Sequence, residues 1–300
     1  MSRFRVVLFL VLVTAVWGVL LAAGLLGGET AVAAPSTIPV TTITVNSGTD
    51  PDTSDSRTCL TYTPCTLRRA IIQARNLPAN EKPVLIAFDI PATAGEGYDS
   101  TLQVWKIQFS GISSAANATL RYLNGSIIID GSTQPGGRSD GPKIILVGPG
   151  TGQWDGLKLG ETAVQNANEI LGLGFQMFKT HIYLNSSSNL IDGNWFGLSD
   201  DGTDVVLRGG GEDDGSGNTG VSVAANTTGN TIQNNVFTGL SGVAAAINGD
   251  DGTFASNYVG TTAAGTVPAK LTDPSLICTP WDWLGGSGIS VSGDGNTIEN

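Results

Sequence analysis

The chain has 300 residues and a formal net charge of −11 at pH 7, with 41 glycines and only 14% charged residues. Its apolar content is sufficient for a hydrophobic core, which indicates an ordered protein rather than a disordered one. The excess of acidic residues argues against a nucleic-acid or anionic-membrane partner, because both need clustered Lys and Arg.

The first 33 residues have the pattern of an export signal. Arg3 and Arg5 precede an apolar run over residues 6–26, and the small residues Ala31 and Ala33 fit a cleavage site. We therefore expect a secreted or cell-surface protein with no membrane insertion after cleavage. The apolar run is also long enough to span a bilayer, so an uncleaved anchor is the alternative. Residues 34–42, rich in Pro, Ser and Thr, form the predicted linker.

Residues 43–110 form the predicted N-terminal cap, which begins with a short strand and contains two cysteines. Cys59 and Cys65 are close in the sequence of an exported chain, so a local disulfide is expected. Cys278 is then left over, either as a buried free thiol or paired with a cysteine beyond Asn300.

A helix is expected directly after the second of these cysteines. Thr66 can cap its N-terminus, and Leu67, Ala70, Ile71 and Ala74 share one face. At its end, a stacked β-structure exposes apolar core side chains and the unpaired backbone N–H and C=O groups of its last strands. We therefore interpret this helix as the cover of the first coil.

Residues 111–300 repeat one short sequence motif with variations, which we call the repeated phrase. Each copy follows a strand with alternating polarity, and the period is 21 residues from Ile170 to Ile191 and 22 from Ile232 to Phe254. The copies occupy residues 168–175, 189–196, 230–237, 252–259 and 296–300, and their partner strands residues 181–184, 220–223, 242–245 and 288–291. The pattern predicts an all-β parallel β-helix with two short strands per coil.

Two columns of equivalent residues explain the repeated phrase. Ile170, Ile191, Ile232, Phe254 and Ile298 are expected in one buried inward column. Asn194, Asn235 and Asn257 fall at equivalent corners, where Asn tolerates left-handed backbone and stacked amides can bond one another as a structural ladder. Phe175, Phe196 and Phe237 are interpreted as an internal aromatic stack.

Four segments resemble a family of bacterial secreted β-helix proteins that begin with a C-S-L-R-E-A-I motif. They are residues 65–71, 84–91, 127–136 and the G-N-x-x-G phrase at 193–197, in that family's order, and the resemblance covers about residues 41–300. It implies a right-handed parallel β-helix of the pectin-lyase-like fold but no settled activity. Arg69 stands where the motif has Glu, so the reciprocal capping box is lost.

Two long loops, residues 198–218 and 261–287, leave from the same corner and are expected side by side on one flank. The first contains adjacent carboxylates, Asp200 with Asp201 and Asp213 with Asp214, which suit calcium but also occur in ordinary Asp-Gly turns. Aromatic side chains that can stack on sugars, or simply cover the coil, are Trp195, Tyr258, Trp281 and Trp283.

Two functions compete. A non-catalytic module that binds polysaccharide or cell-surface glycan is favoured, because the base and acid sets of β-helix lyases and hydrolases are not recognisable. The alternative is a polysaccharide lyase or glycoside hydrolase acting on acidic polysaccharide, whose catalytic residues are unknown. The only histidine, His181, is interpreted as a surface or structural residue.

Overall fold

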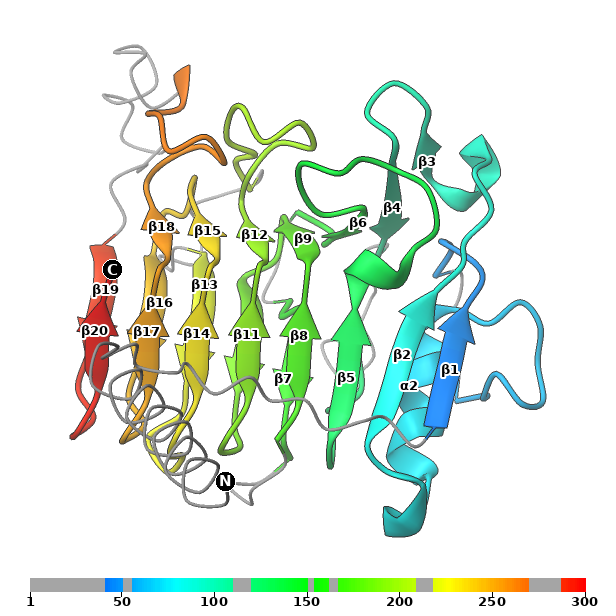
Figure 1. The fold of residues 1–300 in the computed structure, drawn as a ribbon, viewed down its shortest axis with the longest axis horizontal. Coiled ribbons are helices and arrows are strands. Elements are labelled where there is room, and N and C mark those ends of the chain that lie inside the picture. Colours follow the sequence, from blue (N-terminus) through cyan, green and yellow to red (C-terminus); the bar gives the residue numbers. More distant parts are fainter. Residues whose placement is uncertain are drawn as a thin grey trace, which may run out of the picture. The chain divides into compact units, whose positions relative to one another are not determined.

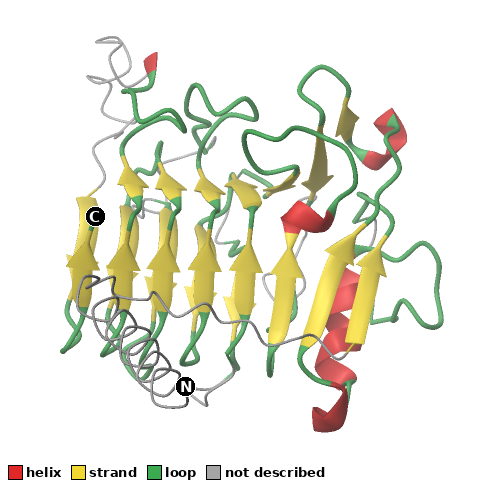
Figure 2. Ribbon diagram, in the orientation of Figure 1, coloured by secondary structure: helices red, strands yellow, loops and turns green. Residues whose placement is uncertain are grey.

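A computed structural model describes residues 41–50, 56–109, 120–150, 154–161, 167–208, 218–269 and 287–300, all within one compact unit, Ile38–Asn300. The leader and most of the linker lie outside these residues. Strand β1 (Thr41–Val45) begins inside the segment expected to be linker. In the described part, strands dominate, and the exceptions are helix α2 (Leu67–Asn76) and the 3-10 turns η1 (Ala79–Glu81), η2 (Ala94–Glu96) and η3 (Gly131–Thr133) (Figures 1 and 2).

The strands form three stacked sheets, as expected for a parallel β-helix. The first sheet has the order β1, β2 (Val84–Phe88), β5 (Ile127–Asp130), β8 (Glu169–Leu171), β11 (Leu190–Asp192), β14 (Thr231–Gln233), β17 (Thr253–Ala255) and β20 (Thr297–Glu299). The second has the order β3 (Tyr98–Asp99), β4 (Val104–Gln108), β6 (Ile144–Val147), β9 (Leu173–Gln176), β12 (Trp195–Phe196), β15 (Val236–Phe237) and β18 (Tyr258–Val259). The third has the order β7 (Leu157–Leu159), β10 (Thr180–Leu184), β13 (Thr219–Val223), β16 (Val243–Ile247) and β19 (Ser287–Val291).

Each complete repeat contributes three strands, not the two expected. In the coil of β10, β11 and β12, the repeated phrase is divided at Asn194 into a strand of the first sheet and a strand of the second. The pairing is parallel throughout except between β3 and β4. The sequence pattern concealed the division because the apolar residues on both sides of the corner point into the same core.

The inward column is present in register across β8, β11, β14, β17 and β20. Ile170, Ile191, Ile232 and Phe254 are buried. Ile298 is 47% exposed, so the expectation that it is buried was wrong. It lies on the last described strand of the sheet, where no described strand packs beyond it. Inside the coils, the rings of Phe175, Phe196 and Phe237 stack with centroids 5.1 and 4.6 Å apart.

Amides form a ladder at the corner between the first and second sheets. The side-chain oxygen of Asn235 accepts the backbone N–H of Asn194 at 2.9 Å, and the oxygen of Asn257 accepts that of Asn235 at the same distance. The left-handed residue is the one before each ladder position: φ is 67° at Gly193, 55° at Asn234 and 53° at Ser256. The ladder Asn therefore supplies hydrogen bonds rather than the unusual backbone conformation.

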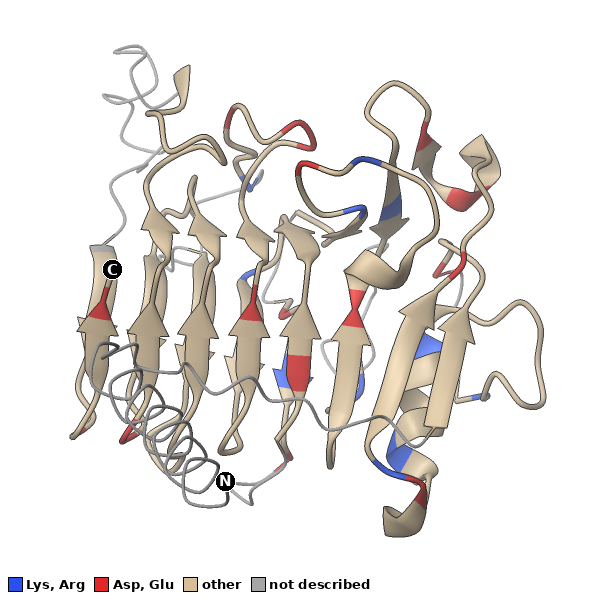
Figure 3. Ribbon diagram, viewed as in Figure 1, with Lys and Arg blue, Asp and Glu red and all other residues tan. Residues whose placement is uncertain are grey.

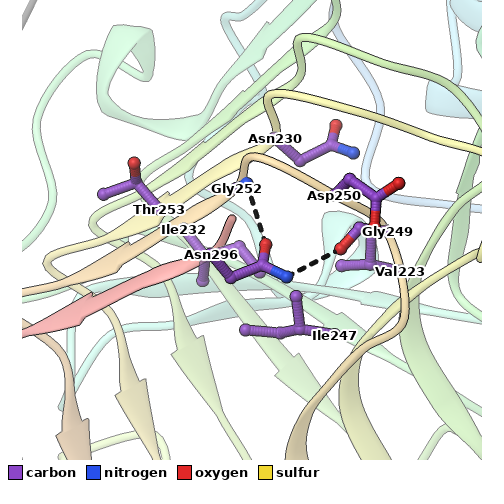
Figure 4. Close-up of a pocket in the computed structure, with 9 residues that line it drawn as sticks. All are labelled: Val223, Asn230, Ile232, Ile247, Gly249, Asp250, Gly252, Thr253 and Asn296. Carbon is purple, nitrogen blue, oxygen red and sulfur yellow. Dashed lines mark hydrogen bonds between the residues drawn. The ribbon is translucent and has the colours of Figure 1, made fainter. Parts of the chain in front are cut away.

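A second ladder precedes the strands of the first sheet and was missed from the sequence. The oxygen of Asn189 accepts the N–H of Asn168, and that of Asn230 accepts the N–H of Asn189, both at 3.0 Å. The next rung is Gly252, which has no side chain. A cavity of about 10 Å³ lies there, beside Asn296, whose amide bonds the backbones of Gly252 and Gly249 (Figure 4).

Helix α2 packs on β1 and β2 at the N-terminal end of the coils. Leu67, Ala70, Ile71 and Ala74 are all at most 1% exposed, and the Thr66 side chain accepts the N–H of Arg69. The predicted disulfide between Cys59 and Cys65 is present. Cys278 lies outside the described residues. None of the helices among the described residues has the length and apolarity needed to cross a membrane.

Charge is unevenly distributed along the stack (Figure 3). In the described residues from β13 onward there is no lysine or arginine, whereas Asp250, Asp251, Asp294 and Glu299 are present. The basic side chains of the described part therefore belong to the cap and the earlier coils.

Candidate ligand-binding site

Three loops lie on one flank of the coils (Figure 1). Each directly precedes or directly follows a strand of the second sheet. They are residues 131–143, 198–208 and 260–269 in the described part. The second and third touch, since the N–H of Ala263 donates to the carbonyl of Gly202 at 3.1 Å. Arg138 of the first loop donates to the carbonyls of Asp200 and Asp201. The described parts of the two long loops thus lie side by side.

A groove of about 510 Å³ lies between the first loop and the corner of the coils. Trp195 contributes an aromatic wall, Arg138 and Lys143 contribute cations, and Gly172 and Gly193 line it without side chains. Both glycines have positive φ and occupy the tight turn before the Asn corner. The turn geometry that the ladder needs therefore also leaves this part of the groove open.

Trp195 is half-buried and is held by the loops around it. The guanidinium of Arg138 lies 4.9 Å from the centre of its ring, a cation–π distance. A Cβ at Gly141 or Gly202 would lie 2.3 or 2.6 Å from the indole, so only glycine permits this close approach. The side chain is therefore both a cover for the coil and part of the groove wall.

The two cations of the groove differ in how they are held. The Arg138 side chain is 9% exposed and pairs with Asp140 at 2.8 Å, and this hydrogen bond is the main reason that the pKa of Asp140 lies below its ordinary value. Lys143 Nζ donates to the carbonyl of Gln134 at 2.6 Å. Carbonyls orient an ammonium without neutralising it, so Lys143 brings positive charge to the groove.

Tyr258 lies in the same column as Trp195, with Val236 between them. Tyr258 is 54% exposed, whereas Val236 is buried. Adjacent strands are about 4.8 Å apart, so the two aromatic residues are roughly 10 Å apart along the stack. Trp281 and Trp283, the other predicted aromatic residues, lie outside the described residues.

Asp200 and Asp201 are engaged with protein groups in the first long loop. Asp200 forms an ion pair with Lys106 and accepts from Gln176 Nε2 at 2.8 Å. Asp201 accepts from the Ser199 hydroxyl at 2.6 Å and from the N–H of Thr203 at 3.0 Å, and the Ser199 bond is the largest cause of its lowered pKa.

Calcium binding at these carboxylates stays a prediction. Asp213 and Asp214 lie outside the described residues, and within the described ranges no group of three or more His, Cys, Asp or Glu side chains is arranged to hold a metal ion.

His181 is structural. It is fully buried, with Phe175, Phe178 and Phe196 in edge contact, and its Nδ1 donates to the carbonyl of Thr219 at 2.8 Å. Burial is the main cause that lowers its pKa to about 4, which keeps the ring neutral at pH 7.

Sequence reasoning missed the basic side of the groove and a carboxyl pair elsewhere. Arg138 and Lys143 follow directly after a segment noted only for its resemblance to a motif. Asp130 and Glu169 lie on neighbouring strands of the first sheet, and the pKa of Glu169 is raised by burial and by the charge of Asp130. Alternation along β5 and β8 could have placed both carboxyls on the outer face.

Comparisons with protein-family models, curated proteins and solved structures gave no match to this chain.

Proposed function

We propose that this protein is a secreted or cell-surface β-helix module that binds polysaccharide or cell-surface glycan on the loop-bearing flank. The observation that carries the proposal is the groove wall formed by Trp195, which is half-buried beside Arg138 and Lys143. Sugars combine an apolar ring face with polar edges, and an aromatic wall beside hydrogen-bond donors suits both. The disulfide and the predicted export signal fit an extracellular location. The resemblance to the C-S-L-R-E-A-I family supports the secreted location and the fold, and it implies no settled activity.

Tyr258 extends the proposed surface. Its exposed ring lies in the same column as Trp195, two strands along the stack, so one extended oligosaccharide can contact both. The acidic later coils favour neutral sugars near Tyr258, whereas Lys143 favours an acidic sugar near Trp195.

The test is calorimetric titration of the full chain with a panel of neutral and acidic oligosaccharides. Tyr258→Ala is expected to weaken binding roughly tenfold, because losing one stacking contact removes about 1 kcal/mol or more. Tyr62→Ala is the matched control, since Tyr62 is 46% exposed and lies in the disulfide loop at the N-terminal cap. Equal weakening by both substitutions, or no binding to any member of the panel, would contradict the proposal.

One observation favours a second candidate, hydrolysis of acidic polysaccharide. Glu169 and Asp130 lie on neighbouring strands, and burial and the charge of Asp130 raise the pKa of Glu169, which is the direction that a general acid needs. Incubating the full chain with the same polysaccharides and measuring new reducing ends tests it. Activity lost in Glu169→Gln but kept in Tyr258→Ala would favour the enzyme over the binding module.

A further inference from the structure

A second pocket lies at the opposite corner of the coils, next to the cap. It has a volume of about 390 Å³ and is bounded by the segment around η1 and by the turn before β5. Lys82, Asn124, Gly125 and Ser126 line it, together with the apolar side chains of Leu77 and Pro83. Polar groups therefore converge on a space that can hold a small molecule or one unit of a larger ligand.

Lys82 is held at the wall of this pocket by its neighbours. Its Nζ donates to the carbonyl of Asn124 at 2.8 Å, which leaves two of the three ammonium protons for other acceptors. A Cβ at Gly125 would lie 3.0 Å from this Nζ, and Gly125 has a φ of +85°. The turn thus needs glycine for its backbone, and the missing side chain keeps the ammonium accessible.

The positive charge at this pocket is not compensated by a close carboxylate. Among the described residues, no Asp or Glu forms an ion pair with Lys82. Arg75, at the end of α2, reaches Glu161 only at 3.6 Å, and the Glu161 side chain is 60% exposed. Burial, and after it the charge of Arg75, lowers the pKa of Lys82. Lys82 therefore lines the pocket as its cation, and Arg75, which is not one of the lining residues, adds positive charge nearby in a chain whose net charge is −11.

We propose that this pocket is an anion-binding site, in which Lys82 takes a carboxylate or phosphate group of a ligand. An oxyanion accepts the free protons of Lys82 and offsets the repulsion between the two cations, both of which favour binding. The Ser126 hydroxyl and the backbone of the turn supply further polar contacts at the wall. This site is separate from the groove at Trp195 and does not rest on the proposed glycan binding.

The experiment titrates the full chain with inorganic phosphate and, separately, with glucuronate at constant low ionic strength, followed by NMR. Saturable shifts are expected, and Lys82→Met is expected to weaken binding roughly tenfold or more, because a charge-assisted hydrogen bond is lost. Lys82→Arg keeps the charge and is expected to retain most of the affinity. The stronger of the two probes identifies whether phosphate or a sugar carboxylate is the better ligand.

Lys158→Met is the matched control. Lys158 is also a half-buried lysine but is already paired with Asp155 at 2.9 Å, so its removal should leave both titrations unchanged. A second readout is modification of Lys82 by an amine-specific reagent at pH 8, which phosphate or glucuronate should slow. Unchanged affinity in Lys82→Met, or no saturable shift with either probe, would overturn the proposal.

Discussion

Asp50 and Arg68 form a buried, doubly hydrogen-bonded ion pair. Arg68 Nε donates to Asp50 Oδ1 at 2.8 Å and Nη2 donates to Oδ2 at 2.7 Å, and both side chains are only 3% exposed. Arg68 belongs to the capping helix, whereas Asp50 follows β1. The pair therefore fixes the helix to the first strand that it covers, in addition to the apolar packing of Leu67 and Ile71.

Breaking this pair should destabilise the protein strongly. Asp50→Asn removes the carboxylate that accepts two hydrogen bonds from the buried Arg68, and we expect the free energy of unfolding to fall by about 3 kcal/mol or more. Asp140→Asn, in a pair whose carboxylate is 78% exposed, should lower it by less than about 1 kcal/mol. Urea denaturation followed by circular dichroism measures both, and similar losses would refute the structural role assigned to the buried pair.

Filling the missing rung of the second ladder should stabilise the protein. Gly252→Asn can supply the oxygen that Asn189 and Asn230 supply to the rungs before them, which is worth about 1 kcal/mol per hydrogen bond. Its Cβ would lie 2.8 Å from Asn296 Oδ1 and 3.1 Å from the carbonyl of Asn230, so Asn296 must shift slightly while it keeps its hydrogen bond to the N–H of residue 252. Gly252→Ala adds the Cβ without the amide and is the control. A melting temperature no higher for Asn than for Ala would show that the rung is not restored.

The single histidine makes stability depend on pH in a defined window. The pKa of His181 is about 4 in the folded chain against an ordinary 6.5, so between these values the unfolded chain binds a proton that the folded chain does not. Stability from this residue is complete above pH 6.5 and falls by about 3 kcal/mol as the pH drops to 4. His181→Gln should remove this part of the slope. An imidazole NMR signal of the folded protein that titrates near 6.5 would contradict the burial.

Asp200→Asn separates the two roles open to this residue. Because Asp200 already pairs with Lys106 and accepts from Gln176, we expect the substitution to lower stability by about 1 kcal/mol even in calcium-free buffer. A calcium site would instead add about 2.7 kcal/mol to the wild type when calcium is 100 times its dissociation constant. Melting temperatures with calcium and with chelator decide between them. A wild-type melting temperature unaffected by calcium excludes the metal.

The fold could be predicted because the same pattern of buried residues recurs in each coil of the solenoid. The column from Ile170 to Phe254 and the phenylalanine stack recur at each period, and one coil therefore checks the next. The exposure of Ile298 could not be predicted from the repeat, because the residue pattern of the last described strand is the same as that of the strands inside the stack. The third strand per coil was concealed because the corner at Asn194 does not interrupt the apolar pattern.

The candidate site was less accessible from the sequence, because its parts come from segments that do not repeat. Trp195 and Tyr258 could be placed in one column by period alone. The contact of Arg138 with Trp195 could not, because it depends on how a loop more than fifty residues earlier folds back over the coil. The sequence identified Asp200 as a carboxylate but could not reveal its ion pair with Lys106. Because of this pair, Asp200 has a structural role in the acidic loop that does not require calcium.

The absence of basic residues from the described part after β13 gives the stack an electric dipole along its axis. Its cap end carries the cations of α2 and the early coils, and its other end carries Asp250, Asp251, Asp294 and Glu299. The cap end also carries carboxylates, so it is the less acidic end rather than a basic one, and a cationic partner is attracted more strongly to the other end, over roughly 8 Å at physiological ionic strength. Lowering the salt concentration lengthens this range, so ionic strength controls how strongly a charged partner distinguishes the two ends of the stack.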